Sequence, residues 1–121
     1  MASHLMISNS RELFLFPADR IVYVEGSGDY SDITMANGKK RTVTCQLGQI
    51  EDLMRSQLQQ DGRHLVRIGK SLIVNMNFIT YINPVKKQIV LSDSNQFEFQ
   101  LSASREALTA LKNHLEESIE N

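Results

Sequence analysis

Short runs of β-branched and aromatic residues, separated by turn residues, constrain the fold of this chain more than any other feature. They are clearest in the stretch RIVYVEGSGDYSDITMANGKKRTVTC. Three runs in this stretch have the composition of strands, at residues 20–25, 30–35 and 40–45. The pair Asn37-Gly38 separates the last two runs, and Asn-Gly in this position is a strong signal for a tight β-hairpin. The stretch therefore predicts short strands joined by turns.

Much of the remaining chain consists of runs of the same kind. We expect further strands at residues 12–16, 65–68, 72–74, 79–82, 88–92 and 96–101. The last of these alternates apolar and polar residues, which is the period of a strand with one buried face. The chain is therefore dominated by strand signals.

Two segments have helical periodicity instead. Apolar residues recur at three- and four-residue steps over residues 48–59, which predicts an amphipathic helix. A second apolar stripe, ending at Ile119, predicts a C-terminal helix that either Ser102 or Ser104 can cap. The sequence therefore predicts one mainly β domain with one internal helix and one C-terminal helix.

The composition is that of an ordinary globular domain. Of the 121 residues, 41% are apolar and 22% charged, which allows a single domain with one core. No run approaches the roughly 20 apolar residues that cross a bilayer, and the start MASHLMISNS lacks the pattern of a secretory signal. We expect residues 1–11 to be a disordered or vector-derived terminus and residues 12–118 to form the domain. Cys45 is the one cysteine, which fits a cytoplasmic protein and predicts a small apolar filler.

The tripeptide Gly69-Lys70-Ser71 raises the question of a nucleotide-binding P-loop. That motif requires another glycine where this chain has His64. The residues on both sides of the tripeptide have strand composition, whereas the serine of a P-loop opens a helix. We therefore interpret the tripeptide as a tight turn between two strands, with Lys70 at its tip.

The sequence offers little for catalysis. Its histidines, His4, His64 and His114, lie far apart and form no spacing that is typical of a metal site. No recognisable set of nucleophile, base and orienting group is present. We therefore expect no enzymatic activity, no metal and no cofactor.

The positive charge is unevenly distributed. The net charge is −1, but residues 39–87 contain nine Lys or Arg against three acids, a local balance of +6. A solvated polar surface explains this distribution as well as an anionic partner does. Lys70, with Arg67 and Ser71 close by, has the cationic and hydroxyl groups that contact phosphates and base edges. Further candidates are Ser104-Arg105 at a helix start and the loop SGDYSD.

Three blocks of the sequence, in order, resemble the LytTR domain, the DNA-binding module of LytR/AlgR-type bacterial response regulators. IVYVEGSGDYSDI resembles the opening strand pair of the family. LVRIGKSLIVNMNFI resembles its most specific block, in which an arginine, a basic or polar residue and a serine precede a Val-Asn pair. LSASREAL resembles the closing Ser-Arg before the terminal helix. The resemblance extends from about Leu13 to Leu115.

The resemblance implies an elongated fold of about ten short, mostly antiparallel strands in small stacked sheets. It also implies sequence-specific regulation of transcription in the bacterial cytoplasm, within two-component systems, with double-stranded DNA as the partner. Members of the family bind direct repeats in promoters through loops that enter successive major grooves. Two copies of the chain are therefore expected to form a dimer on DNA.

The resemblance assigns DNA binding to residues of three loops: Ser31, Arg67, Gly69, Lys70, Ser71 and Arg105. Base contacts fall on Ser31, Lys70 and Arg105, while Arg67 is expected to touch the DNA backbone or to brace its loop. Asn75 is expected to satisfy backbone groups within the protein.

The chain also departs from the family pattern. Gly69 stands where members often carry histidine, Ser31 is short, and the net charge is slightly negative. These departures keep a second interpretation open, namely a LytTR-like protein-interaction or regulatory module that no longer binds DNA. Since no receiver domain precedes the module, we expect either a piece of a response regulator or a stand-alone regulator.

Overall fold

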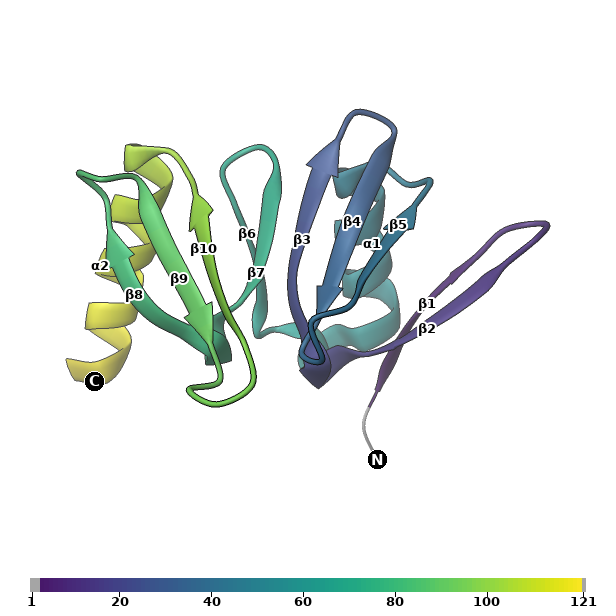
Figure 1. Ribbon diagram of the computed structural model, residues 1–121, viewed down its shortest axis with the longest axis horizontal. Coiled ribbons are helices and arrows are strands. Elements are labelled where there is room, and N and C mark those ends of the chain that lie inside the picture. Colours follow the sequence, from purple (N-terminus) through teal and green to yellow (C-terminus); the bar gives the residue numbers. More distant parts are fainter. Residues whose placement is uncertain (1–2, 121) are drawn as a thin grey trace.

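The computed structural model describes residues 3–120, which contain ten strands and two α-helices. The strands are β1 (His4–Ser8), β2 (Leu13–Pro17), β3 (Ile21–Ser27), β4 (Tyr30–Met35), β5 (Lys40–Val43), β6 (Leu65–Ile68), β7 (Leu72–Asn75), β8 (Ile79–Asn83), β9 (Gln88–Ser92) and β10 (Glu98–Ser102), and the helices are α1 (Leu47–Leu58) and α2 (Arg105–Glu120). They form antiparallel sheets of two, five and three strands, arranged along the long axis of the molecule (Figure 1). The mainly β fold with an internal and a C-terminal helix is thus confirmed.

The five-stranded sheet has the order β5-β4-β3-β7-β6, so β3 lies in its centre and pairs with both β4 and β7. The predicted hairpin turn joins β4 to β5. Its Gly38 has a φ of 84°, and the side-chain oxygen of Asn37 accepts a hydrogen bond from Lys39 N at 3.0 Å. A positive φ suits glycine because it has no Cβ, which is why this dipeptide predicted the turn.

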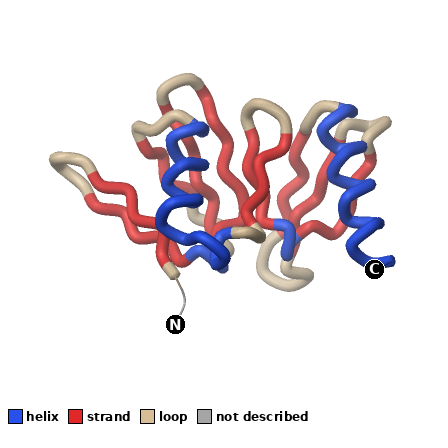
Figure 2. Tube along the Cα trace, turned by 180° about the vertical axis from the view of Figure 1, so that it is seen from behind, coloured by secondary structure: helices blue, strands red, loops and turns tan. Residues whose placement is uncertain are grey.

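One face of the five-stranded sheet is covered by α1 and the β1–β2 hairpin (Figure 2). The helix begins with a capping box, in which Gln46 and Gln49 each bond the backbone of the other. The sheet, helix and hairpin together enclose the first hydrophobic core, whose buried members include Leu5, Ile7, Phe16, Ile21, Val24, Ile33, Ile50 and Met54. Cys45 packs against this core as expected.

The other face of β3 and β7 contributes to a second core, which also contains β8, β9, β10 and α2. Val22, Val74, Ile89, Leu91 and Leu108 are among its buried members. Two apolar clusters therefore meet across the central strand, which is why four consecutive residues of β3 are buried. Such burial on both faces suppresses the period-two alternation that is expected for a strand with one solvated face.

The structure decides how α2 begins and how much of it is buried. Ser104 is the cap, since its side-chain oxygen accepts from Ala107 N at 3.1 Å. Leu108 and Leu111 are buried, but Ile119 is 86% exposed. The apolar stripe therefore packs only along the first part of the helix, because Ile119 lies beyond the residues that form the second core. No helix within residues 3–120 is long and apolar enough to cross a bilayer.

Residues 1–11 were expected to be disordered or vector-derived, and the structure corrects the expected disorder for part of this segment. Residues 4–8 form β1, which pairs with β2 in register from His4 with Pro17 to Ser8 with Leu13. Leu5 and Ile7 are buried in the first core, so apolar burial stabilises this strand. Residues 1–2, which were expected to be part of the same disordered segment, lie outside the described residues.

Candidate nucleic-acid interface

The pairing of β3 with β7 brings two turns together. Because these strands are antiparallel neighbours, the turn that leaves β3 and the turn that enters β7 lie at the same end of the sheet. Gly26 N donates a hydrogen bond to Ser71 O at 2.8 Å, which joins the two hairpins next to their tips. Figure 1 shows the β3–β4 and β6–β7 turns at the same end of the molecule.

The three-stranded sheet presents two more segments at that end. Asn83 at the end of β8 and Ser102 at the end of β10 both pair with Gln88 of β9. Ala103 N also donates to Lys87 O at 3.3 Å. The β8–β9 turn and the junction between β10 and α2 are therefore neighbours, and both lie on the same side as the first two turns (Figure 1).

The turns of the five-stranded sheet and those of the three-stranded sheet approach each other at Gly69. A Cβ placed on Gly69 would lie 3.8 Å from the Cβ of Ala107, so the β6–β7 turn lies against the first turn of α2. Residues 27–31, 69–71, 84–87 and 103–105 therefore lie at one end of the molecule, and we call the surface at this end the loop surface. The structure thus brings positions 31, 70 and 105 to one side of the molecule.

Lys70 lies at the tip of the β6–β7 turn and is exposed. Gly69, just before it, has a φ of 65°, a conformation that glycine adopts without strain. The neighbouring Arg67 braces the turn: its Nη2 donates to Lys70 O at 2.8 Å, and its Nη1 lies 3.2 Å from Glu51 Oε1. Within residues 3–120, Lys70 itself forms no ion pair. The turn therefore presents an exposed ammonium group, and its backbone is held by the hydrogen bond from Arg67.

Ser31 is placed differently from Lys70. Its side chain is buried, and its Oγ donates to Cys45 O at 2.7 Å, so the hydroxyl ties β4 to the segment before α1. The exposed residues of the same turn are Ser27, Gly28, Asp29 and Tyr30. A contact between Ser31 and a base stays a prediction, and it requires the hydroxyl to leave its carbonyl partner.

Arg105 is the first residue of α2 and is exposed. It follows the capping Ser104, so its backbone belongs to the first turn of a 16-residue helix, where the amino-terminal N–H groups lie. These N–H groups and the helix dipole favour a negatively charged ligand. The position therefore combines two features that attract phosphate.

Asn75, at the end of β7, has the internal role that the resemblance implied. It is fully buried, donates from Nδ2 to Ile21 O at 2.8 Å and accepts from Asn77 N at 2.9 Å. These hydrogen bonds tie the end of β7 to the start of β3. They support the strand register that sets the two adjoining turns side by side.

Lys86 and Lys87 are part of the loop surface, although the sequence alone did not identify them as candidates. Both side chains are exposed, and the turn is held by a bond from Lys86 N to Asn83 Oδ1 at 3.1 Å. The cations and the Asn83-Pro84 turn signal are visible in the sequence. The sequence does not show the strand register that places this turn beside α2, because that register depends on long-range strand pairing.

Most of the exposed charges on the loop surface are cationic. No group of three or more His, Cys, Asp or Glu side chains within residues 3–120 is placed to hold a metal ion. The loop surface instead carries four exposed cations outside any ion pair of the described chain: Lys70, Lys86, Lys87 and Arg105. Exposed cations on rigid turns are suited to electrostatic and hydrogen-bonded contact with a polyanion.

Comparisons with known proteins agree with this geometry. The family model described as the LytTr DNA-binding domain matches residues 11–116. A solved structure described as the LytTr DNA-binding domain of a methyl-accepting/DNA response regulator from Bacillus cereus has the same fold, with a TM-score of 0.61 and 19% sequence identity over 95% of this chain and 98% of that one. No curated protein sequence matches the chain. Since the family model covers nearly the whole domain, the chain belongs to the LytTR family of DNA-binding domains.

Proposed function

We propose that this protein is a transcription regulator that recognises specific promoter sequences by inserting the turns of its loop surface into the major groove of double-stranded DNA. One observation carries the proposal: turns from both larger sheets meet on one surface with four exposed cations. In a family of DNA-binding domains, such a surface is the natural place for contact with a polyanion. By analogy with the regulators of this family, we place its action in the bacterial cytoplasm, downstream of a two-component signal.

The shape of the β6–β7 hairpin supports entry into the groove. Two antiparallel strands lie about 5 Å apart, and the major groove of B-DNA is about 12 Å wide, so a hairpin tip can enter it. Lys70 is at the outermost point of this tip, where it can reach the acceptors on the edge of guanine. The exposed Ser71 beside it adds a hydroxyl group. Lys70 is therefore our first choice for a base contact.

The remaining residues divide into contacts and supports. Arg105 reads a base or phosphate in the next groove, and Lys86 and Lys87 contact phosphates between the two positions. Arg67 braces the turn of Lys70 through its two hydrogen-bonded partners. In the free protein the buried Ser31 holds the β3–β4 turn through its bond to Cys45, so exposed neighbours in that turn approach the DNA together with it.

We further propose that two copies bind direct repeats in the same orientation. A single loop surface offers only four exposed cations, which limits the affinity of one copy for DNA. Linking two binding events on adjacent repeats multiplies affinity without new contacts in either copy. Cooperative binding to paired sites, with weak binding to a single site, is the expected behaviour.

Selection of bound duplexes from a randomised DNA pool tests the proposal directly. We expect enrichment of two copies of one short motif in the same orientation. On the selected site, Lys70→Ala and Arg105→Ala should each weaken binding by about 1–3 kcal/mol, the range for a good base contact. Arg55→Ala serves as the matched control, because Arg55 lies near the end of α1 in a salt bridge with Asp52 and outside the loop surface. Unchanged affinity for both loop variants would refute these assignments.

A second function is favoured by specific features of the same surface. Ser31 turns its hydroxyl inward, Gly69 has no side chain, and Asp29 and Glu106 add negative charge close to the cations. A LytTR-like module that binds a protein instead of DNA would tolerate these features. If this second function is correct, selection from the DNA pool enriches no motif. Affinity purification instead recovers a protein partner, and Lys70→Ala and Arg105→Ala weaken its binding.

A further inference from the structure

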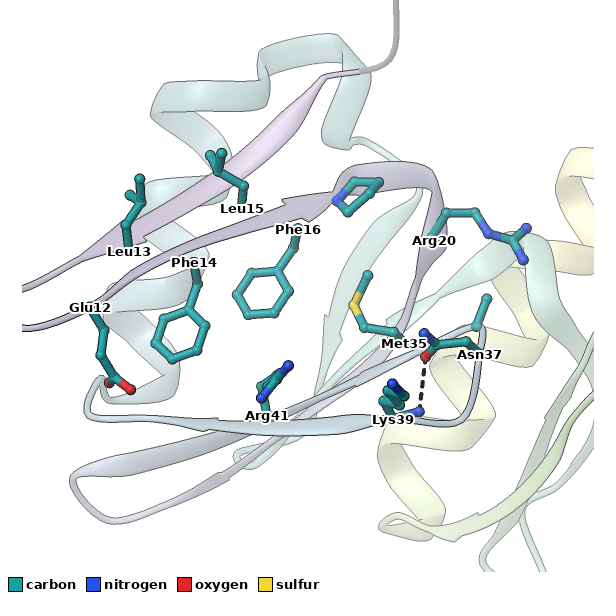
Figure 3. A pocket seen from close by; sticks show the side chains of 12 residues that line it. Glu12, Leu13, Phe14, Leu15, Phe16, Arg20, Met35, Asn37, Lys39 and Arg41 are labelled. Carbon is teal, nitrogen blue, oxygen red and sulfur yellow. Dashed lines mark hydrogen bonds between the residues drawn. The ribbon is translucent and has the colours of Figure 1, made fainter.

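A groove of about 740 Å³ lies between β2 and the β4–β5 hairpin, on a part of the molecule separate from the loop surface. Figure 3 shows Phe14 and Phe16 pointing from β2 towards the hairpin, where Met35 and Arg41 lie. The two phenyl rings are stacked, with centroids 5.7 Å apart. We call this space the hairpin groove. Its wall is therefore partly aromatic, although it is open to solvent.

Residues 12–17, which include β2, line this groove. Within residues 3–120, β2 has β1 as its one strand neighbour, so its outer edge has no strand partner there. On the opposite strand, Met6 directs its backbone away from β2, because both its N and its O bond the side-chain amide of Gln57 at 2.8 and 3.0 Å. Met6 pairs with Leu15. Two residues that pair across antiparallel strands direct their backbone N–H and C=O groups either towards each other or away from each other. Since the groups of Met6 point away from β2, those of Leu15 point away from β1, and so do those of Leu13 two residues earlier. No described strand pairs with β2 on that side.

The two edges of the β1–β2 sheet therefore differ in what covers them. Gln57 satisfies the backbone of Met6 much as an additional strand would, so that edge is covered by α1. The edge at Leu13 and Leu15 has no such cover within residues 3–120. Their side chains are also 57% and 56% exposed. An uncovered apolar strand edge is a template for pairing with another chain.

Charge around the groove indicates what kind of chain fits. Arg20, Lys39 and Arg41 line it and are exposed, and none of them forms an ion pair with a described residue. Glu12 is the one acid that lines the groove. The sign of this surface favours an acidic occupant. It disfavours a second copy of this chain paired edge to edge, because that arrangement would bring both sets of cations together.

We propose that the hairpin groove binds an extended acidic segment of a partner protein, which adds to β2 as a third strand. Backbone groups of the segment pair with Leu13 and Leu15. Alternate side chains of the segment lie beside the half-buried Phe14, and its carboxylates lie near Lys39 and Arg41. Strand addition takes most of its affinity from the main chain and its specificity from alternate side chains. The protein would then engage a second macromolecule while its loop surface is occupied by DNA.

A peptide of alternating glutamate and valine, about seven residues long so as to span β2, is a suitable probe. Labelled with a fluorophore, it is titrated with the full chain and its anisotropy is measured. We expect saturable binding of this peptide and none of the corresponding lysine and valine peptide. In amide NMR spectra, the resonances of Leu13 and Leu15 should shift, while those of Lys70 and Lys87 should not. Shifts confined to the loop surface would mean that the peptide imitates DNA, and would overturn the proposal.

Two double substitutions measure how much the positive charge of the groove contributes to peptide binding. Lys39→Gln with Arg41→Gln should raise the Kd for the acidic peptide about fivefold, because exposed ion pairs contribute modestly. Arg55→Gln with Arg63→Gln removes the same charge away from the groove and should leave the Kd unchanged. If both pairs of substitutions raised the Kd equally, the peptide would be responding to the net charge of the protein alone, and the proposal would be wrong. Neither pair belongs to the loop surface, so DNA binding reports separately on the proposed function.

The backbone contribution is tested in two ways. Leu15→Pro removes an outward N–H that β1 does not use, and proline is tolerated on such an edge. It should raise the Kd more than about tenfold, because a main-chain hydrogen bond is lost and the edge is blocked. Two probe peptides, N-methylated at either the odd-numbered or the even-numbered amides, test the same contact on the unaltered protein. The peptide whose methyl groups replace the N–H groups that face β2 should fail to bind. Full binding by both methylated peptides would rule out strand addition.

A second copy remains the alternative occupant to be tested. Sedimentation of the unmodified chain across a concentration series should show no association that depends on β2. If the chain instead dimerises, and Leu15→Pro abolishes the dimer, then the edge is an interface between copies and the proposed acidic partner is wrong.

Discussion

Replacing Lys86 and Lys87 by glutamine should make DNA binding much less sensitive to salt. The loop surface carries four exposed cations outside any ion pair of the described chain. If each neutralises one phosphate, the slope of log K against log salt is about −3.6, and affinity falls about 150-fold between roughly 50 and 200 mM salt. Without two of them, the slope is about −1.8 and the same change in salt weakens binding only about 12-fold.

The assay is a fluorescence anisotropy titration on a labelled duplex of arbitrary sequence, repeated at several KCl concentrations. An arbitrary sequence is suitable because phosphate contacts do not depend on the bases. Arg55→Gln with Arg63→Gln makes the same change in net charge away from the loop surface and should preserve the wild-type slope. A slope that is unchanged in the Lys86 and Lys87 variant, or equally reduced in the control, would refute the placement of DNA on this surface.

Three further predictions concern the support of the fold. Asn75→Ala should lower the free energy of unfolding by about 2–4 kcal/mol in urea titrations, because the buried Ile21 O loses its donor and Asn77 N its acceptor. Thr34→Val should change it by less than about 1 kcal/mol or increase it, because the buried Thr34 hydroxyl has no hydrogen-bond partner among residues 3–120. Desolvation acts to raise the pKa of Asp93, but hydrogen bonds from backbone N–H groups, that of Phe97 foremost, outweigh it and lower the pKa below its ordinary 3.8. The contribution of this carboxylate is therefore fully present above about pH 4 and is lost as pH falls through the lowered pKa, so the stability advantage of wild type over Asp93→Asn should shrink on acidification.

Each of these expectations has a clear contrary result. A loss below about 1 kcal/mol for Asn75→Ala would mean that water or a shift of the backbone replaces its hydrogen bonds. A substantial loss for Thr34→Val would mean that the hydroxyl has a partner. Parallel stability curves for wild type and Asp93→Asn between neutral and acid pH would mean that the charge of the carboxylate does not matter to the turn.

The positions of strands and helices were largely readable from the sequence, because they depend on local signals. The Asn37-Gly38 turn, the two helical stripes and the turn at Lys70 all occur where the sequence predicted them. The exception at the N-terminus is informative. The segment 4–8 is short and bounded by polar residues, so its strand forms only because Leu5 and Ile7 reach a core built by distant residues.

The choice of site residues depended more on tertiary structure. Ser31 and Lys70 both lie close to glycine-containing turns, and the family resemblance assigns both of them to base contacts. In the folded chain one hydroxyl bonds Cys45, whereas the other side chain has no ion-pair partner among residues 3–120. Which side of a strand is covered depends on what packs there, and a pattern with period two does not contain that information.

The sequence by itself determined the family, the mainly β class, the positions of the main turns and the identity of Lys70 and Arg105 as candidate contacts. Only the tertiary structure showed that Lys86 and Lys87 lie on the same surface, that Arg67 braces the turn of Lys70, and that one edge of β2 is uncovered. The reason is physical. Turn and helix signals act between residues that are close in the chain, whereas a shared surface or an open edge depends on which distant strands pair and in which register.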